Sequence, residues 1–117
     1  MSDSGIFMGW SRPAIGQEAK AMGLYKRLTL YMRKLHAEGQ IVSFEPVMLG
    51  AHGGDLGGFV LIRGDRAKLD TVRNSPEFRE LTVRASVSLN GFRVVRAHFG
   101  NGVEQILLAY QRIATES

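Results

Sequence analysis

Arginine and histidine at alternating positions are the residues of this sequence best suited to chemistry. Arg96 and His98 share one parity of a predicted strand. In another predicted strand, Arg63 shares a parity with Phe59 and Leu61. Residues two apart on a strand lie on one face of the sheet. The pattern therefore predicts an apolar surface with two guanidinium groups, which suit a carboxylate or other anion, and an imidazole suited to acid-base catalysis.

This surface forms a binding site only if both parities face away from the helices. Trp10, at the end of the first predicted strand, would then line the same cavity. Apolar walls with a few convergent polar groups are typical of small-molecule sites. We take His98 as the candidate catalytic residue here, and Arg63, Arg96 and Trp10, with the apolar pair above, as ligand-binding. The alternative is that both arginines form ion pairs at strand ends and His98 is a hydrogen-bonded interface residue.

A glycine-rich turn carries the second candidate pair, His52 and Asp55. The four glycines between positions 53 and 58 would let the backbone approach a ligand closely. His52 is thus a second catalytic candidate and Asp55 a ligand-binding one, while the alternative is a local side-chain cap of the turn. A single His-x-x-Asp pair does not define a metal site, so we expect no metal.

Composition limits the chemistry further. The 117 residues contain no cysteine, which excludes disulfides, thiolate nucleophiles and cysteine-based metal sites. No other motif indicates a cofactor, and we expect none. A net charge of +4 favours anionic partners. With no long apolar run and no basic leader, we expect a cytoplasmic protein without a membrane segment.

Periodicity predicts the elements that must position these residues. Strands are expected over 5–10, 41–49, 59–63 and 92–99, and helices over 17–38, 65–72, from 76 onward and about 103–115. Pro46 lacks a backbone donor, so its strand belongs at a sheet edge. Asp65 and Ser75 are expected to cap two separate helical pieces, and Gly39 to end the first helix.

This β-α-β-β-α-β order predicts one α+β domain over 1–117, with a core of about 5–100 and an added C-terminal helix. Right-handed crossovers give a four-stranded antiparallel sheet in the order 4-1-3-2, with the long helices on one face. The chain resembles the ferredoxin-like proteins of the dimeric α/β-barrel superfamily, including short uncharacterised bacterial YciI-like and monooxygenase-like proteins. The residues that carry the resemblance are His52-Gly53-Gly54-Asp55, Gly57 to Asp65 and Ser75-Pro76-Glu77-Phe78.

The resemblance implies a homodimer, and the strands give a separate reason for one. Large apolar residues occupy both parities of the later strands. The face without helices would thus expose a patch that includes Phe59, Leu61 and Val94. Two such faces packed together would bury it, which places the predicted dimer interface and the predicted pocket on one surface.

Three functions remain open from the sequence. The first is a dimer that binds a small apolar or carboxylate-bearing molecule in a sheet-lined cavity. The second is a cofactor-free enzyme of the monooxygenase or isomerase type that uses His98 or His52, because relatives in the superfamily include such enzymes. The third is an RNA-recognition module, which has the same element order but needs more aromatic residues than the Phe59 found in the corresponding strand. Nucleic acid is therefore the least favoured partner.

Overall fold

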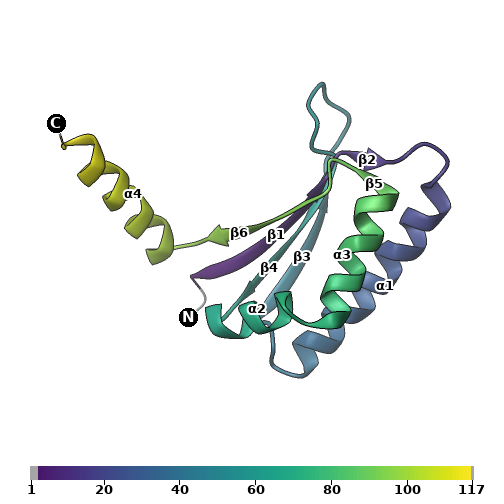
Figure 1. Cartoon of the computed structure of the whole chain (residues 1–117), viewed down its shortest axis with the longest axis horizontal. Coiled ribbons are helices and arrows are strands. Elements are labelled where there is room, and N and C mark those ends of the chain that lie inside the picture. Colours follow the sequence, from purple (N-terminus) through teal and green to yellow (C-terminus); the bar gives the residue numbers. More distant parts are fainter. Residues whose placement is uncertain (1–2, 117) are drawn as a thin grey trace.

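Four strands and three helices form a two-layer body, and a fourth helix extends from it (Figure 1). The structure is a computed structural model that describes residues 3–116. Its main elements are β1 (Ser4–Trp10), α1 (Glu18–Ala37), β3 (Ser43–Met48), β4 (Gly58–Gly64), α2 (Arg66–Arg73), α3 (Pro76–Ser88), β6 (Arg93–His98) and α4 (Asn101–Ala114). The predicted β-α-β-β-α-β order is confirmed.

The sheet is antiparallel throughout, with strand order β3-β4-β1-β6. Counted in the four strands expected from the sequence, this is the predicted order 4-1-3-2. The central strand β1 pairs with β4 on one side and β6 on the other. Pro46 lies in the edge strand β3, where its missing N–H costs no ladder hydrogen bond.

Helices α1, α2 and α3 cover one face of the sheet and bury the core against it. Alternate residues of the two central strands face these helices, among them Ile6, Met8 and Ile62, each 1% exposed. The predicted caps are confirmed: the Asp65 carboxylate accepts from the Lys68 N–H, and Ser75 begins α3. Local side-chain signals therefore set the residues at which α2 and α3 begin.

A second, two-stranded sheet was not predicted. It pairs β2 (Arg12–Pro13) with β5 (Leu89–Asn90), each only two residues long. Alternation cannot be recognised in two residues, so the sequence pattern carries no sign of it. The pair ties the segment before α1 to the segment after α3.

The other face of the sheet is covered by no helix within residues 3–116, and we call it the open face. Phe7 and Phe59 stack on it with ring centroids 5.2 Å apart. Register places the following residues on this face: Phe7, Val47, Phe59, Leu61, Arg63, Val95 and Ala97. The prediction that Val94 belongs to this patch was wrong, because Val94 pairs with Met8 and therefore points toward the helices.

Glycines of β1 let aromatic rings lie flat on the open face. A Cβ atom at Gly5 would collide with the Phe99 ring, and one at Gly9 would collide with the Phe7 ring. Both glycines point to the open face because they alternate with the core residues of β1. The centre of the open face is consequently a layer of phenyl rings packed on backbone.

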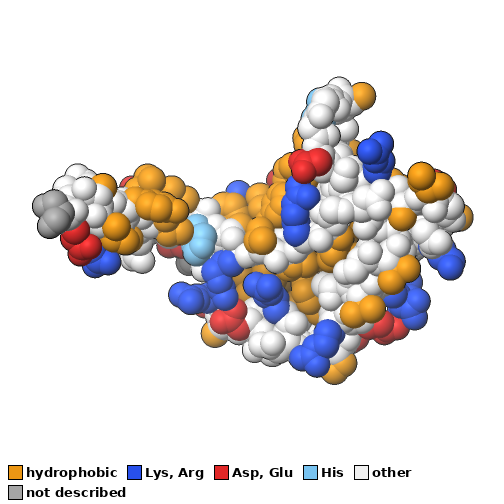
Figure 2. Space-filling model, turned by 45° about the horizontal axis from the view of Figure 1, so that its top comes forward, with side chains coloured by type: hydrophobic (Ala, Val, Ile, Leu, Met, Phe, Trp, Pro, Cys, Tyr) orange, Lys and Arg blue, Asp and Glu red, His pale blue; other side chains and the backbone are white. Residues whose placement is uncertain are grey.

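Helix α4 leads away from the body and buries none of its residues. It confirms the predicted amphipathic C-terminal helix, and Figure 2 shows its hydrophobic side chains gathered along one side. No helix within residues 3–116 is long and apolar enough to cross a membrane.

Candidate functional site

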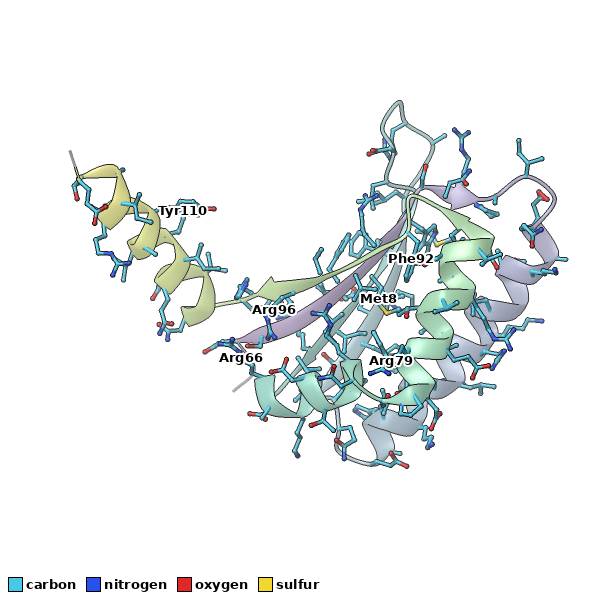
Figure 3. The ribbon with its side chains drawn as sticks, viewed as in Figure 1. Met8, Arg66, Arg79, Phe92, Arg96 and Tyr110 are labelled. Carbon is cyan, nitrogen blue, oxygen red and sulfur yellow. The ribbon has the colours of Figure 1, made fainter. Side chains whose placement is uncertain are left out.

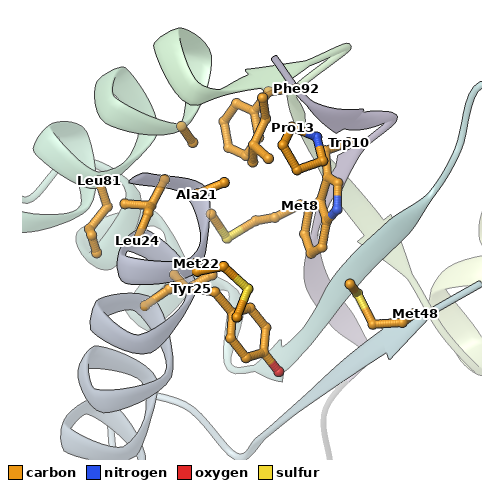
Figure 4. A pocket seen from close by; sticks show the side chains of 13 residues that line it. Met8, Trp10, Pro13, Ala21, Met22, Leu24, Tyr25, Met48, Leu81 and Phe92 are labelled. Atoms are coloured by element: carbon orange, nitrogen blue, oxygen red, sulfur yellow. The ribbon is translucent and has the colours of Figure 1, made fainter. Parts of the chain in front are cut away.

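An apolar cavity of about 320 Å³ lies between α1, α3 and the sheet, at the end where β1 finishes (Figure 4). The sheet contributes Met8 and Trp10 from β1 and Met48 from β3. The remaining walls include Ala21, Met22, Tyr25 and Leu28 of α1, Leu81 and Ala85 of α3, and also Pro13, Leu89 and Phe92. The cavity therefore draws on both layers of the fold.

Small residues at core positions create this space. Ala21 of α1 and Ala85 of α3 are 9% and 4% exposed, at core positions of helices whose other buried residues are mostly large. At the other end of α3, Phe78 packs into the core cluster together with Leu69. Methyl groups cannot span the distance that a phenyl ring or a leucine fills. The layers thus touch at one end and leave a cavity at the other.

The two-stranded sheet of β2 and β5 lies at one end of the cavity. Pro13 pairs with Leu89, and both line the cavity. Two further backbone hydrogen bonds reinforce this end, from Ser11 N to Asn90 O and from Ala14 N to Ser88 O, each 2.8 Å. They hold the segment before α1 and the end of α3 together at this end of the cavity.

The chemistry of the cavity is almost wholly apolar. Among residues 3–116, no Asp, Glu, His, Lys or Arg side chain lines it. Its polar groups are the phenol of Tyr25 and the indole N–H of Trp10. Met22 and Met48 are 66% and 70% exposed and form a flexible rim. The arrangement suits a hydrophobic guest with at most one or two hydrogen-bonding groups.

A polar hollow lies at the opposite end of the sheet, where β6 passes into α4. It measures about 320 Å³ and contains Arg66, Arg96 and His98, together with Asn101 and Gln105. The Arg96 guanidinium donates to the Asp70 carboxylate across 2.6 Å, which already satisfies part of its charge. Figure 3 shows Arg66 and Arg96 beside each other near this junction. The structure therefore brings Arg96 and His98 together, but in an exposed and polar setting.

The prediction that Arg63 shares a surface with Arg96 and His98 was wrong. Arg96 pairs with Ile6, a core residue, and so lies on the helix side of the sheet. Arg63 pairs with Gly5 and lies on the open face with Phe59 and Leu61. Parity groups residues within one strand, but only the register between strands says which parities share a face. The two candidate sets therefore lie on opposite faces of the sheet.

Two of the predicted ligand-binding residues, Arg63 and Trp10, lie on opposite faces of the sheet. The Arg63 guanidinium lies over the Phe99 ring, 3.8 Å from its centroid. Trp10 faces the helices, so it lines the apolar cavity and not the open face. The predicted dimer surface and the cavity are consequently two separate places.

The glycine-rich turn uses His52 for its own geometry. One ring nitrogen of His52 lies 2.6 Å from the Leu56 carbonyl oxygen, and the other accepts from the Gly54 N–H at 2.9 Å. With both nitrogens engaged, the imidazole acts as the local cap that formed the alternative interpretation. Asp55 is exposed and lies outside the apolar cavity.

The basic side of α1 faces acidic residues of α3. Lys34 lies 3.1 Å from Glu77, and Arg27 lies 3.9 Å from Glu80. The hydrogen bond to the Glu77 carboxylate raises the pKa of the Lys34 ammonium above its usual value. These exposed ion pairs partly neutralise the positive charge of α1. Less of that charge is therefore left to attract an anionic partner.

Sequence reasoning missed most of the cavity. Tyr25, Met48 and Phe92 fall inside a predicted helix and two predicted strands, and their spacing does not mark them as site residues. The available signal is the small size of Ala21 and Ala85 at buried positions of their helices. It could not be used without knowing that the two alanines line the same end of the core.

Comparisons with known proteins give the fold and no more. No protein-family model and no curated protein matches the sequence. A crystal structure of PA3566 from Pseudomonas aeruginosa matches with a TM-score of 0.61 and 14% identity, covering 84% of this chain and 94% of that one.

Two further solved structures are similar. A Bacteroides fragilis protein, described as dimeric, of unknown function and ferredoxin-like in fold, has a TM-score of 0.57 and 11% identity, covering 82% of this chain and 96% of that one. NE2512 of Nitrosomonas europaea, also of unknown function, has a TM-score of 0.58 and 17% identity, with 85% and 90% covered. The chain thus has the ferredoxin-like fold expected from its sequence.

Proposed function

We propose that the protein binds a small, largely apolar molecule in the cavity between α1, α3 and the sheet. The observation that carries the proposal is the lining, in which Tyr25 and Trp10 supply the polar groups of an otherwise hydrocarbon wall. Concave apolar pockets with few polar groups are the usual form of small-molecule sites.

The volume limits the size of the guest. About 320 Å³ is near the lower end of the roughly 300 to 1,000 Å³ typical of ligand pockets. A compound of one or two rings, or a short branched chain, fits this space. Tyr25 is 38% exposed, so its phenol can contact both a guest in the cavity and the solvent.

Binding is a better proposal than acid-base catalysis. Neither His98 nor His52 lines the cavity, and the lining offers no carboxylate or basic side chain to move a proton. The absence of an arginine there also favours an uncharged guest over a carboxylate-bearing one.

We further propose that the protein is a homodimer that pairs its open sheet faces. Phe7, Phe59 and Leu61 lie on a face that no helix of the described chain covers. These side chains are half-buried, and an uncovered apolar layer of this kind is typical of an interface. The similar Bacteroides fragilis protein is described as dimeric, which supports the same assembly here.

The binding proposal can be tested with the single tryptophan as reporter. Because Trp10 is the one tryptophan of the chain and lines the cavity, its fluorescence reports contact with a guest directly. Bromobenzene, a heavy-atom quencher that fits the volume, should quench Trp10 saturably. The variant Ala21→Leu, which fills the cavity, should weaken that binding about ten-fold or more.

Ala37→Leu is the matched control, because Ala37 is exposed at the end of the same helix. It should leave the titration unchanged. Linear, unsaturable quenching that is identical in both variants and in the unmodified protein would mean that the cavity takes up no guest.

A further inference from the structure

Helix α4 exposes an apolar stripe that the described part of the chain leaves uncovered. Val103, Leu107, Tyr110 and Ile113, spaced four and three apart, share one side of the helix. They are 40%, 59%, 69% and 58% exposed. We call these four residues the outer stripe. Helices in folded proteins obtain most of their stability by packing an apolar side against other residues. Helix α4 buries no residue, so its apolar side still lacks a packing partner.

The junction between β6 and α4 fixes where the outer stripe points. The Phe99 N–H donates to Asp3 O at 2.9 Å, and the Gly102 N–H donates to Phe99 O at 2.8 Å. Gly100, with φ +50°, makes the turn between them. These bonds tie the start of α4 to the chain beside β1. In the structure the helix leaves this junction in an outward direction and does not lie over its own sheet.

The outer stripe and the open face lie next to the same solvent-filled region on the uncovered side of the sheet. Figure 3 shows Tyr110 projecting from α4 into the region next to the uncovered side of the sheet. At the opposite end of the sheet, the Leu56 side chain reaches Gly9 on the open face. The 49–57 hairpin and α4 thus stand at the two ends of the same apolar surface (Figure 1).

The amount of surface indicates that the two regions act together. Burying one large aliphatic side chain removes on the order of 100 Å² from water, so the outer stripe offers a few hundred Å². A stable interface needs about 800 Å² from each partner. The stripe alone is too small for a stable interface, so it can contribute only as part of a larger one that includes the open face.

We propose that the outer stripe of α4 packs on a second copy of this chain, as one continuous interface with the paired open faces. The proposal rests on the homodimer proposed above and adds that the C-terminal helix of each protomer packs against the other protomer. In a two-fold dimer the same patch serves both partners, so the exposed helices are buried in pairs.

The charge of α4 argues against a membrane as the occupant. Its polar side carries Glu104, Gln105, Gln111 and Arg112, with one acid and one base. Helices that lie on membranes usually have Lys/Arg-rich polar sides. A neutral polar side is instead suited to a helix that is half buried between two copies of a protein.

Adjacent leucines provide a matched test. Leu107 lies in the outer stripe, whereas Leu108, 63% exposed, has only polar residues three and four positions away. Both substitutions leave the body intact, since α4 buries no residue in it. In sedimentation equilibrium, Leu107→Glu should raise the dimer dissociation constant about ten- to a hundred-fold, and Leu108→Glu should leave it within about two-fold.

A third variant separates this proposal from the dimer itself. Leu61→Lys places a charge on the open face. If it dissociates the dimer while Leu107→Glu does not, the sheet interface stands and the role of α4 is refuted. An unmodified chain that is monomeric at high micromolar concentration would remove both proposals.

Thiol labelling distinguishes a second copy from the protein's own sheet. The chain has no cysteine, so Val103→Cys introduces a single probe into the outer stripe, and Leu108→Cys serves as its control. Labelling of Val103→Cys should slow about ten-fold as the protein concentration passes the dissociation constant, while Leu108→Cys should react at a constant rate. Protection of the first thiol at every concentration would show docking on the same chain and would overturn the proposal.

Discussion

Gly57 shows how one residue can position a binding site. Its N–H donates to Trp10 O at 2.8 Å, and its carbonyl accepts from Leu49 N at 2.9 Å. A Cβ atom there would overlap the Ser11 carbonyl oxygen, which belongs to rigid backbone. The absence of a side chain at Gly57 therefore lets the hairpin hold the strand end that presents Trp10 to the cavity.

Substituting this glycine should be costly. Gly57→Ala is expected to lower the free energy of unfolding by about 2 kcal/mol or more, because the backbone must move to admit the methyl group. Gly53→Ala, in the same hairpin with open space around its Cβ position, should change it by less than about 0.5 kcal/mol. Urea denaturation measures both. Equal effects would mean that the close approach at Gly57 does not contribute to stability.

The candidate site shows where residue-level reasoning from sequence stops. Alternation correctly grouped Phe59 with Arg63, and Arg96 with His98, because parity is a property of one strand. The two groups were joined wrongly, since the register between distant strands is set by tertiary packing. The roles suggested for those residues stay predictions, and the apolar cavity depends on contacts between helices that no local pattern encodes.

At the scale of the elements, Ser75 links two helices and the core. Its hydroxyl accepts from Phe78 N at the start of α3, donates to Val72 O at the end of α2, and lies 3.2 Å from the Tyr31 hydroxyl. The kink between α2 and α3 is consequently defined by one side chain that contacts three elements.

Removing this cap should destabilise the fold moderately. Ser75→Ala is expected to cost about 1 to 2 kcal/mol, because it leaves the first turn of α3 and the Tyr31 hydroxyl without a partner. Ser86→Ala is the control: Ser86 is exposed inside the same helix and bonds only to the Thr82 carbonyl. That change should be neutral or slightly stabilising in thermal denaturation, since alanine is the better helix former. A loss as large as that of Ser75→Ala would contradict the capping argument.

Elements with strong local signals were predicted well. Asp65, Ser75 and Gly39 each mark a helix boundary through a side-chain or backbone preference that acts within a few residues. The β2–β5 pair was missed because it is held by chain segments far apart in sequence. Its two strands are too short to show a period.

At the scale of the whole molecule, the apolar open face predicts concentration-dependent stability. If two chains share this face, the melting temperature should rise with protein concentration, because association stabilises the folded state by mass action. Leu61→Lys should abolish that dependence while circular dichroism still reports a folded chain.

Leu30→Lys is the corresponding control, because Leu30 is 64% exposed on α1, away from the open face. It should keep the concentration dependence of the unmodified protein. A melting temperature that is independent of concentration in all three proteins would rule out a dimer in this range.

The position of β1 has a consequence for how the chain folds. It is the first strand of the sequence, yet it lies at the centre of the sheet, and its partners begin at Gly58 and Arg93. During synthesis, β1 leaves the ribosome with neither neighbour made, and its second edge stays open until the last strand emerges. Such distant pairings slow folding and leave apolar strands exposed in the meantime. We expect nascent chains that end before β6 to be the ones that most need chaperone protection.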